Sequence, residues 1–248
     1  MINKCILIGI KEYKYSNLSK LDGIYFDVFN MEKIVKKISK NRAEIIKILD
    51  NGVNIEPTKD NILNNIKQIF LNLEDNENIF IFYGGHGSSV KSSTTSQNKY
   101  YNQIINVMYN SYITDEEIID LLKLVTSDNN KIIFVFDSCH SGDILDLKYK
   151  LINNKFEKSN ENINEYKKSN IIAICSCKFN QKSVDGANGG AFTNRFIEIL
   201  KKYNYKISFI NLHNELNDRL RFLFRYFNLE QNPEISSSKK HHIDNKIF

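Results

Sequence analysis

Two residues of this sequence, His86 and Cys139, have the types and the setting that nucleophilic catalysis needs. Each follows a short apolar run, residues 78–83 for the histidine and residues 131–136 for the cysteine. The carboxyl ends of parallel strands lie at one edge of a sheet, so we expect the two side chains to meet there. A thiol needs a base or a cationic neighbour to form a thiolate near neutral pH, and an imidazole is such a group. The pair therefore predicts thiol-based nucleophilic chemistry.

Glycine surrounds the histidine, at positions 84, 85 and 87. Glycine tolerates backbone conformations that a side chain forbids, which suits a tight turn where the backbone of a peptide approaches closely. We expect the backbone N–H groups of Gly87 and Cys139 to bind an oxyanion that forms when the thiolate attacks a carbonyl.

Each of these residues also has a structural interpretation. A lone buried cysteine is usually a small hydrophobic residue, and a lone histidine is usually a structural hydrogen-bond donor. Finding both at strand ends inside glycine-flanked turns favours the catalytic interpretation. His140 is a rival base, but as the sequence neighbour of Cys139 it is expected to point elsewhere. Cys175 and Cys177 lack further zinc ligands nearby and are interpreted as packing residues.

The elements that must position these groups alternate along the chain. Apolar runs that predict strands occupy residues 4–10, 43–49, 78–83, 131–136 and 170–177, and amphipathic stretches that predict helices occupy residues 22–40, 60–71, 114–125, 191–203 and 207–224. This order predicts an α/β fold with a mostly parallel central sheet flanked by helices. Thr114 followed by Glu117 is typical of a capping box at a helix start.

The size and composition predict one domain, residues 1–248. The polar segments 88–103 and 148–169 are interpreted as exposed loops. No uncharged apolar stretch approaches the ~20 residues of a membrane span, so no membrane partner is expected. The 34 Lys and Arg residues are scattered among 29 Asp and Glu, which argues against specific nucleic-acid binding. Four cysteines without a secretory signal indicate an intracellular, cytoplasmic protein.

Around the two chemical positions the sequence resembles the caspase-like clan of cysteine peptidases, and the metacaspases most closely. Residues 83–87 read YGGHG, and residues 137–142 read DSCHSG, which agrees in full with the metacaspase pattern. Further matches follow in order along the chain: KCILIGI, LDGIYFDVFNM, EPTKDNIL, ITDEEI, CSCKFNQKS, GGAFTNRFIEIL and QNPEISSS.

The resemblance implies the caspase-hemoglobinase fold. It divides the chain into a large-subunit-like region at residues 1–147, a linker at residues 148–169 and a small-subunit-like region at residues 170–248. It also predicts a last strand beyond the SSS element, in residues 243–248. Because metacaspases do not form dimers by pairing edge strands, a monomer is expected.

The resemblance also implies an activity, the hydrolysis of protein or peptide substrates after Arg or Lys, with no cofactor for the bond-breaking itself. The positions that match the acidic specificity pocket are Asp27 and Asp137, and a carboxylate pair suits a guanidinium. Taken without the family, Asp27 is equally well a carboxylate on a helix face. The sequence departs from the family at two pocket positions, where Gly84 replaces the usual Ser and Ile24 the usual Cys.

Many metacaspases need calcium, which binds carboxylate oxygens. The matching positions are Asn102, Asp115, Glu116 and Asp146, and the first of these is an Asp in typical members. Losing one negative ligand lowers the affinity for a divalent cation, so we expect weak calcium activation. A solvated helix N-terminus explains Asp115 and Glu116 almost as well.

The linker contains lysines at which the enzyme would cut itself, among them Lys148, Lys150, Lys167 and Lys168. The alternative is a lysine-rich loop with no such role. Two other hypotheses remain for the whole chain. A catalytically weak caspase-like scaffold that acts by protein–protein binding is favoured by the departures at Gly84 and Ile24. A nucleotide-binding flavodoxin-like domain lacks a phosphate-binding glycine loop after its first strand.

Overall fold

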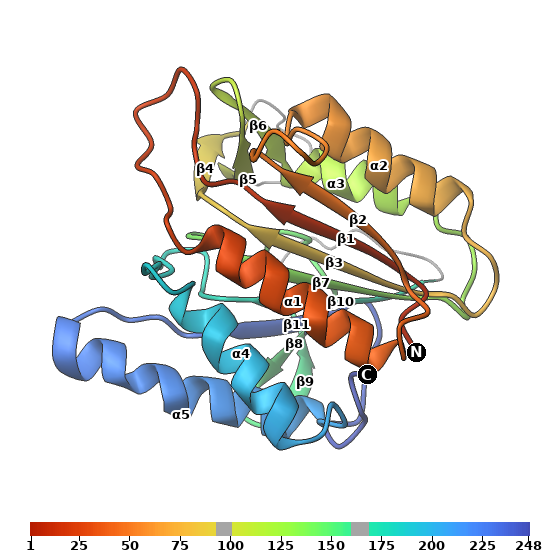
Figure 1. Cartoon of the computed structure of the whole chain (residues 1–248). Coiled ribbons are helices and arrows are strands. Elements are labelled where there is room, and N and C mark those ends of the chain that lie inside the picture. Colours follow the sequence, from red (N-terminus) through yellow and green to blue (C-terminus); the bar gives the residue numbers. More distant parts are fainter. Residues whose placement is uncertain (93–100, 160–168) are drawn as a thin grey trace.

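The computed structural model describes residues 1–92, 101–159 and 169–248. Its main sheet has the strand order β2-β1-β3-β7-β10-β11-β8-β9, and a smaller sheet has the order β4-β5-β6 (Figure 1). The strands of the main sheet are β1 Lys4–Gly9, β2 Glu44–Leu49, β3 Asn78–Gly84, β7 Lys131–Asp137, β8 Tyr149–Ile152, β9 Lys155–Lys158, β10 Asn170–Cys175 and β11 Glu234–Ser237. The strands of the smaller sheet are β4 Gly87–Lys91, β5 Tyr101–Val107 and β6 Ser111–Thr114.

The first five strands of the main sheet in spatial order are parallel, as predicted. Strands β3 and β7 lie side by side near its centre, and every residue after the first in each is buried. Burial on both faces explains why these two runs are apolar without alternation. The expected α/β fold with a mostly parallel sheet and flanking helices is confirmed.

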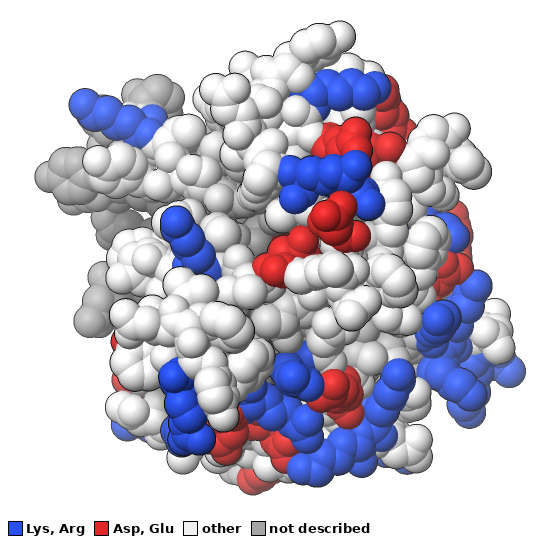
Figure 2. Space-filling model, turned by 60° about the vertical axis from the view of Figure 1, so that its left-hand side comes forward, with Lys and Arg blue, Asp and Glu red and all other residues white. Residues whose placement is uncertain are grey.

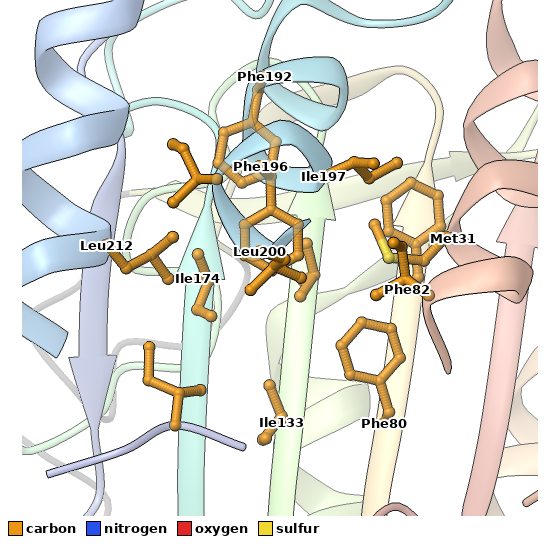
Figure 3. Packing of buried hydrophobic residues seen from close by; sticks show 14 of the residues in the cluster. Met31, Phe80, Phe82, Ile133, Ile174, Phe192, Phe196, Ile197, Leu200 and Leu212 are labelled. Atoms are coloured by element: carbon orange, nitrogen blue, oxygen red, sulfur yellow. The ribbon is translucent and has the colours of Figure 1, made fainter. Parts of the chain in front are cut away.

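Helices cover both faces of the main sheet (Figure 1). They are α1 Ile24–Ile38, α2 Lys59–Leu71, α3 Asp115–Leu122, α4 Ala191–Lys202 and α5 Phe209–Phe227. One hydrophobic cluster joins α1, α4 and α5 to the sheet, and a second cluster joins α2 and α3 to its other face. Figure 3 shows the first cluster, where Phe196 and Leu200 of α4 lie over Ile133 and Ile174 of the strands, and Met31 of α1 lies beside Phe82.

Helix α1 shows how an apolar stripe positions a polar group. Ile24, Val28, Met31 and Val35 recur at helical spacing and are buried against the sheet. Asp27 lies in the first turn of the same buried face, with 1% of its surface exposed. Burying a carboxylate is unfavourable in free energy unless the group is hydrogen-bonded, ion-paired or needed to bind a ligand. Asp27 is therefore a candidate functional residue.

The predicted capping box at the start of α3 is confirmed. The Thr114 hydroxyl accepts a hydrogen bond from the Glu117 N–H at 3.2 Å, and the Glu117 carboxylate accepts one from the Thr114 N–H at 3.1 Å. These bonds satisfy N–H groups that have no partner within the helix.

The two segments expected to be loops are partly strands. Residues 87–91 and 101–107 form β4 and β5, and residues 149–158 form the hairpin β8–β9, which pairs with β11. The prediction failed because the hairpin has few buried apolar residues. Its cross-strand partners Leu151 and Phe156 are buried, but Lys150, Lys155 and Glu157 flank them in the sequence. Residues 93–100 and 160–168, which include Lys167 and Lys168, lie outside the described residues.

The end of the chain also differs from the expectation. Residues 243–248 form no strand and make one isolated bridge, from Lys246 to Ser208. The last strand is β11, which runs antiparallel to β10. Ile247 is nevertheless buried, and its N–H donates to the carbonyl of Ile207, so the end packs against the segment before α5. Within the described residues, no helix combines the length and apolar character that crossing a membrane requires.

Candidate active site

The ends of β3 and β7 bring the two predicted chemical residues to one place. Gly84 and Asp137 are partners in the parallel ladder, and His86 and Cys139 each follow two residues later. Both line a single cavity of about 340 Å³ at the carboxyl edge of the sheet. The sequence-based expectation that a thiol and an imidazole share this edge agrees with the structure.

His86 is oriented by a backbone carbonyl. Its Nε2 lies 2.7 Å from the carbonyl oxygen of Ser19. A carbonyl can only accept, so Nε2 carries the hydrogen and Nδ1 is left to take or give a proton. The His86 N–H donates to the hydroxyl of Tyr13 at 2.6 Å, and the two rings pack with centroids 5.0 Å apart. Ser19 was not predicted, because a carbonyl that any residue supplies leaves no mark in a sequence.

The turn before His86 is crowded by two phenols. The Tyr83 hydroxyl lies 2.8 Å from the carbonyl oxygen of His86 and 2.7 Å from that of Asn106, and donates to them. A Cβ on Gly85 would lie 2.6 Å from the hydroxyl oxygens of both Tyr13 and Tyr83. Glycine is required here because a side chain would displace the hydroxyls that hold the histidine backbone.

Cys139 is a partly buried thiol. Its Sγ accepts a hydrogen bond from the Ser183 N–H at 3.3 Å. Burial raises the pKa of the thiol, and the Asp137 carboxylate raises it further, while the Ser183 N–H and the charge of Lys182 oppose the rise. The resting group is therefore a neutral thiol at pH 7, and its activation needs a base.

His140, the rival base, is engaged elsewhere. Its backbone is left-handed, with φ of 56°, and its Nδ1 lies 2.6 Å from the carbonyl oxygen of Phe179. Its N–H donates to the carbonyl of Gln181 at 3.0 Å. These contacts tie the turn to the loop after β10 and direct the His140 ring towards that loop.

The expected oxyanion donors lie on adjoining backbone segments. The Asn106 N–H donates to the His86 carbonyl at 2.9 Å, so the next ladder pair, Gly87 with Ile105, falls at a non-hydrogen-bonded position. The Gly87 N–H therefore points away from β5. A Cβ on Gly87 would lie 2.2 Å from the Cys139 carbonyl oxygen, so the two segments are in contact.

Asp27 and Asp137 meet around one glycine. The Asp27 Oδ2 accepts from the Gly190 N–H at 2.9 Å. The Asp137 oxygens accept from the hydroxyls of Ser183 and Thr193, each at 2.6 Å. A Cβ on Gly190 would lie 2.3 Å from the Asp137 Oδ2 and 3.4 Å from the Asp27 Oδ2. The pair that sequence resemblance placed in a pocket is thus a real neighbouring pair in the cavity.

The electrostatics of this pair favour a cation. Burial raises the pKa of Asp27 from its ordinary value of 3.8 to about 8, and the nearby Asp137 charge contributes. Burial also raises the pKa of Asp137, against the hydrogen bonds from Ser183 and Thr193. Two neighbouring buried carboxylates repel each other, so a positively charged ligand between them would relieve a cost that the empty cavity carries.

The residues expected to bind calcium are only partly assembled. The Asp115 carboxylate accepts from the N–H groups of Gln103 and Glu116 at 3.0 and 2.8 Å. Asn102, next to Gln103, is buried, and its Oδ1 has no hydrogen-bond partner. In the part of the chain that the structure describes, no group of three or more His, Cys, Asp or Glu side chains is placed to hold a metal ion.

Charges of both signs surround the cavity. Figure 2 turns the carboxyl ends of the strands forward and shows Lys and Arg interspersed with Asp and Glu on this face. The loop between β1 and α1 contributes the ion pairs Lys20–Glu12 and Lys11–Asp22.

Comparisons with known proteins agree with this geometry. The family model "Caspase domain" matches residues 2–242. The chain is 28% identical to Metacaspase-2 of Trypanosoma brucei brucei over 265 residues, which cover 97% of this chain and 74% of that protein. It is 28% identical over 152 residues to Metacaspase-1A of Neurospora crassa, covering 59% of this chain and 33% of that protein. The crystal structure of protein GSU0716 from Geobacter sulfurreducens has the same fold, with a TM-score of 0.71 at 18% identity over 100% of this chain and 98% of that chain.

Proposed function

The chain belongs to the caspase-domain family of peptidases, and on that premise we propose that it is a cysteine endopeptidase that cleaves after Arg or Lys. The observation that carries the proposal is one cavity that contains the Cys139 thiol, the His86 imidazole and the carboxylates of Asp27 and Asp137. The thiol and the imidazole supply the chemistry of peptide hydrolysis, and the carboxylates supply affinity for a basic side chain.

The reaction follows from the positions of these groups. His86 takes the proton of Cys139 through Nδ1, and Sγ attacks the carbonyl carbon of the scissile bond. The resulting oxyanion is bound by the N–H groups of Gly87 and Cys139. His86 then gives its proton to the leaving amine, and a thioester remains. Water, deprotonated by His86, hydrolyses the thioester to a carboxylic acid and the free thiol.

In the resting structure His86 is bonded to the Ser19 carbonyl and Cys139 to the Ser183 N–H. These are bonds to two different loops, so the imidazole and the thiol are held in place separately. Catalytic hydrogen bonds commonly tighten when substrate binds, and the substrate carbonyl would lie between the two groups.

The first prediction concerns specificity. Among fluorogenic peptides that end in Arg, Lys or Asp, we expect cleavage of the first two, faster by about 100-fold or more than cleavage of the Asp peptide. Fluorescence release by the wild type measures it, with Cys139→Ala as the control. Cysteine-dependent cleavage after Asp alone would show that Asp27 and Asp137 do not bind a basic side chain. If no peptide is cleaved, the alternative hypothesis of a caspase-like scaffold that acts by protein–protein binding is favoured.

Calcium activation is a separate and weaker proposal. The residues that would supply oxygen ligands are Asn102, whose Oδ1 has no hydrogen-bond partner, Asp115 and Glu116 at the start of α3, and Asp146. We therefore expect an increase in turnover of only a few-fold, with an apparent affinity of roughly 10⁻⁴–10⁻³ M. Turnover of the arginyl peptide in excess chelator and in added calcium measures it. Equal turnover in chelator and in added calcium would show that calcium does not activate the enzyme.

Self-processing is also proposed, at fewer positions than the sequence suggested. The side chain of Lys150 is 15% exposed, pairs with Asp143 and belongs to β8, so this lysine is a poor cleavage site while the hairpin is formed. Lys148 precedes β8 and is half-buried. Intact-mass measurement of the wild type and Cys139→Ala after incubation would show cleavage products only in the wild type if self-processing occurs.

A further inference from the structure

One loop contacts His86 at both its backbone and its ring. Residues 10–23 connect β1 to α1, and the Ser19 carbonyl in this segment accepts a hydrogen bond from Nε2 at 2.7 Å. Tyr13, earlier in the same loop, accepts a hydrogen bond from the His86 N–H at 2.6 Å, and its ring packs against the imidazole. Tyr13 is buried and is not among the described residues that line the cavity. Any effect of Tyr13 on catalysis is therefore exerted through the histidine that it holds.

Tyr13 and Tyr83 form a chain of hydrogen bonds that begins and ends on His86. The His86 N–H donates to the Tyr13 hydroxyl, and the two phenol hydroxyls are hydrogen-bonded to each other. The Tyr83 hydroxyl lies 2.8 Å from the His86 carbonyl oxygen and 2.7 Å from that of Asn106. A carbonyl can only accept, so Tyr83 uses its hydrogen there and Tyr13 donates to Tyr83. Hydrogen bonds in a chain of this kind polarise and strengthen one another.

Both phenols keep their hydrogens near neutral pH. Burial raises the pKa of Tyr13 and of Tyr83 above the ordinary value of 10.0. The chain of hydrogen bonds is therefore intact over the whole range in which a thiol and an imidazole exchange a proton.

The backbone around His86 needs such a restraint. His86 lies between β3, which ends at Gly84, and β4, which starts at Gly87, and Gly85 precedes it directly. Glycine restrains the chain less than any other residue, so the turn alone defines the position of the histidine poorly. The two phenols fix the peptide groups on both sides of His86, and thereby the direction in which its side chain leaves the backbone.

We propose that Tyr13 is a positioning residue for His86, and that its hydroxyl, together with that of Tyr83, holds the imidazole where it can exchange a proton with Cys139. The proposal rests on the proposed peptidase function and deepens it by assigning a role to a residue outside the cavity. Proton transfer requires its two partners within hydrogen-bond reach, and a displacement of about 1 Å can lower a rate by about 100-fold.

The competing explanation is that Tyr13 only fills space in the core. Tyr13→Phe separates the two explanations, because it keeps the ring and removes the hydroxyl alone. The matched control is Tyr25→Phe. The Tyr25 hydroxyl donates to Asp50 at 3.2 Å, and Asp50 accepts from the N–H groups of Lys11 and Glu12 at the start of the same loop. This control removes a phenol hydroxyl that anchors the loop at Asp50 instead of at His86.

Two measurements test the proposal. Hydrolysis of an arginyl peptide gives kcat and KM for the wild type, Tyr13→Phe, Tyr83→Phe, the double variant and Tyr25→Phe. Alkylation of Cys139 by iodoacetamide at pH 7, followed by intact mass, reports how readily the thiol is deprotonated and needs no peptide turnover. His86→Ala gives the alkylation rate without the base, and Cys139→Ala gives the background from the other, buried thiols. Thermal unfolding shows whether each variant is folded.

We expect Tyr13→Phe to lower kcat by about 10–100-fold and to leave KM within about 3-fold, because the substrate still binds but the base is misplaced. Its alkylation rate should fall towards that of His86→Ala. Tyr83→Phe should behave alike, and the double variant should be hardly slower than the slower single variant, because either substitution opens the same chain. Tyr25→Phe should keep both rates within about 2-fold of the wild type.

An unchanged kcat in Tyr13→Phe, a change confined to KM, or an equal loss in Tyr25→Phe would overturn the positioning role. Failure of the proposed function gives a different result, in which the wild type hydrolyses no peptide. The alkylation rates then still decide the role of Tyr13, since equal rates in the wild type and Tyr13→Phe would contradict it.

Discussion

Replacing Cys139 or His86 by alanine is expected to lower kcat/KM for an arginyl peptide by about 10⁴-fold or more, while the protein stays folded. In the proposed reaction Cys139 supplies the atom that forms the thioester, and no second thiol lines the cavity among the described residues. In the same proposed reaction every proton transfer passes through His86. Because the two act as a unit, the double variant should be hardly slower than either single variant.

The matched control for this experiment is His140→Asn. Asparagine tolerates the left-handed backbone at this position, and the His140 ring contacts the Phe179 carbonyl. We expect a decrease of less than about 10-fold, because only an anchor of the turn is lost. Peptide hydrolysis and thermal unfolding are measured for all variants. If His86→Ala keeps most of its activity, His86 is not the catalytic base. If His140→Asn loses its activity, His140 has a larger role than anchoring the turn.

The sequence revealed the parts of the site that depend on local pattern. The unbroken apolar runs of β3 and β7 predicted central strands, and strand ends are where chemical groups gather in such sheets. His86 and Cys139 follow those strands directly, so their meeting could be predicted. Asp27 needed the family resemblance at first, and the structure adds the physical signal, a carboxylate within the buried stripe of α1.

The parts that could not be predicted depend on contacts between distant segments. Ser19 orients His86 from 67 residues away, through a carbonyl that every residue has. Ser183 contacts the thiol from 44 residues away, through its backbone N–H. None of these positions has a spacing that marks it in the sequence.

The hairpin β8–β9 was missed for a different reason. Its composition is that of an exposed loop, and few side chains pack it against the core: the buried Leu151 and Phe156 and the partly buried Tyr149. Tertiary packing overrides composition in such short strands. Lys150, one of the lysines at which self-cleavage is expected, is therefore an ion-paired residue of the sheet.

The Asp27–Asp137 carboxylate pair and the Cys139 thiol are electrostatically linked. The Asp137 charge is one of the causes that raise the pKa of the Cys139 thiol, and Asp137 also repels Asp27. A cationic substrate would offset these negative charges, so binding should favour ionisation of Asp27 and make the thiol easier to deprotonate. The substrate that fits the pocket would then also assist the nucleophile, whereas a neutral side chain would not.

Asn at position 27 tests this arrangement through stability as well as activity. Between pH 4 and pH 8 the folded protein retains a proton on Asp27, whose pKa is about 8, that the unfolded chain has lost at its ordinary value of 3.8. This group therefore makes the free energy of unfolding fall as the pH rises through that window. Asn removes the dependence and can still accept from the Gly190 N–H.

We therefore expect Asp27→Asn to melt close to the wild type near pH 4 and above it at pH 8, by about 2–4 °C for each kcal/mol of repulsion removed. The same variant should lose about 10-fold or more of its kcat/KM for an arginyl peptide, and the rise of that constant towards pH 8 should become shallower. Thermal unfolding at four pH values and peptide hydrolysis over the same range measure both effects. If the melting temperatures of the wild type and Asp27→Asn change with pH in the same way, Asp27 is ionised in the resting protein. A variant that is more stable at pH 8 yet less active would show that the site keeps a buried carboxyl group, at a cost in stability, in order to bind a cation.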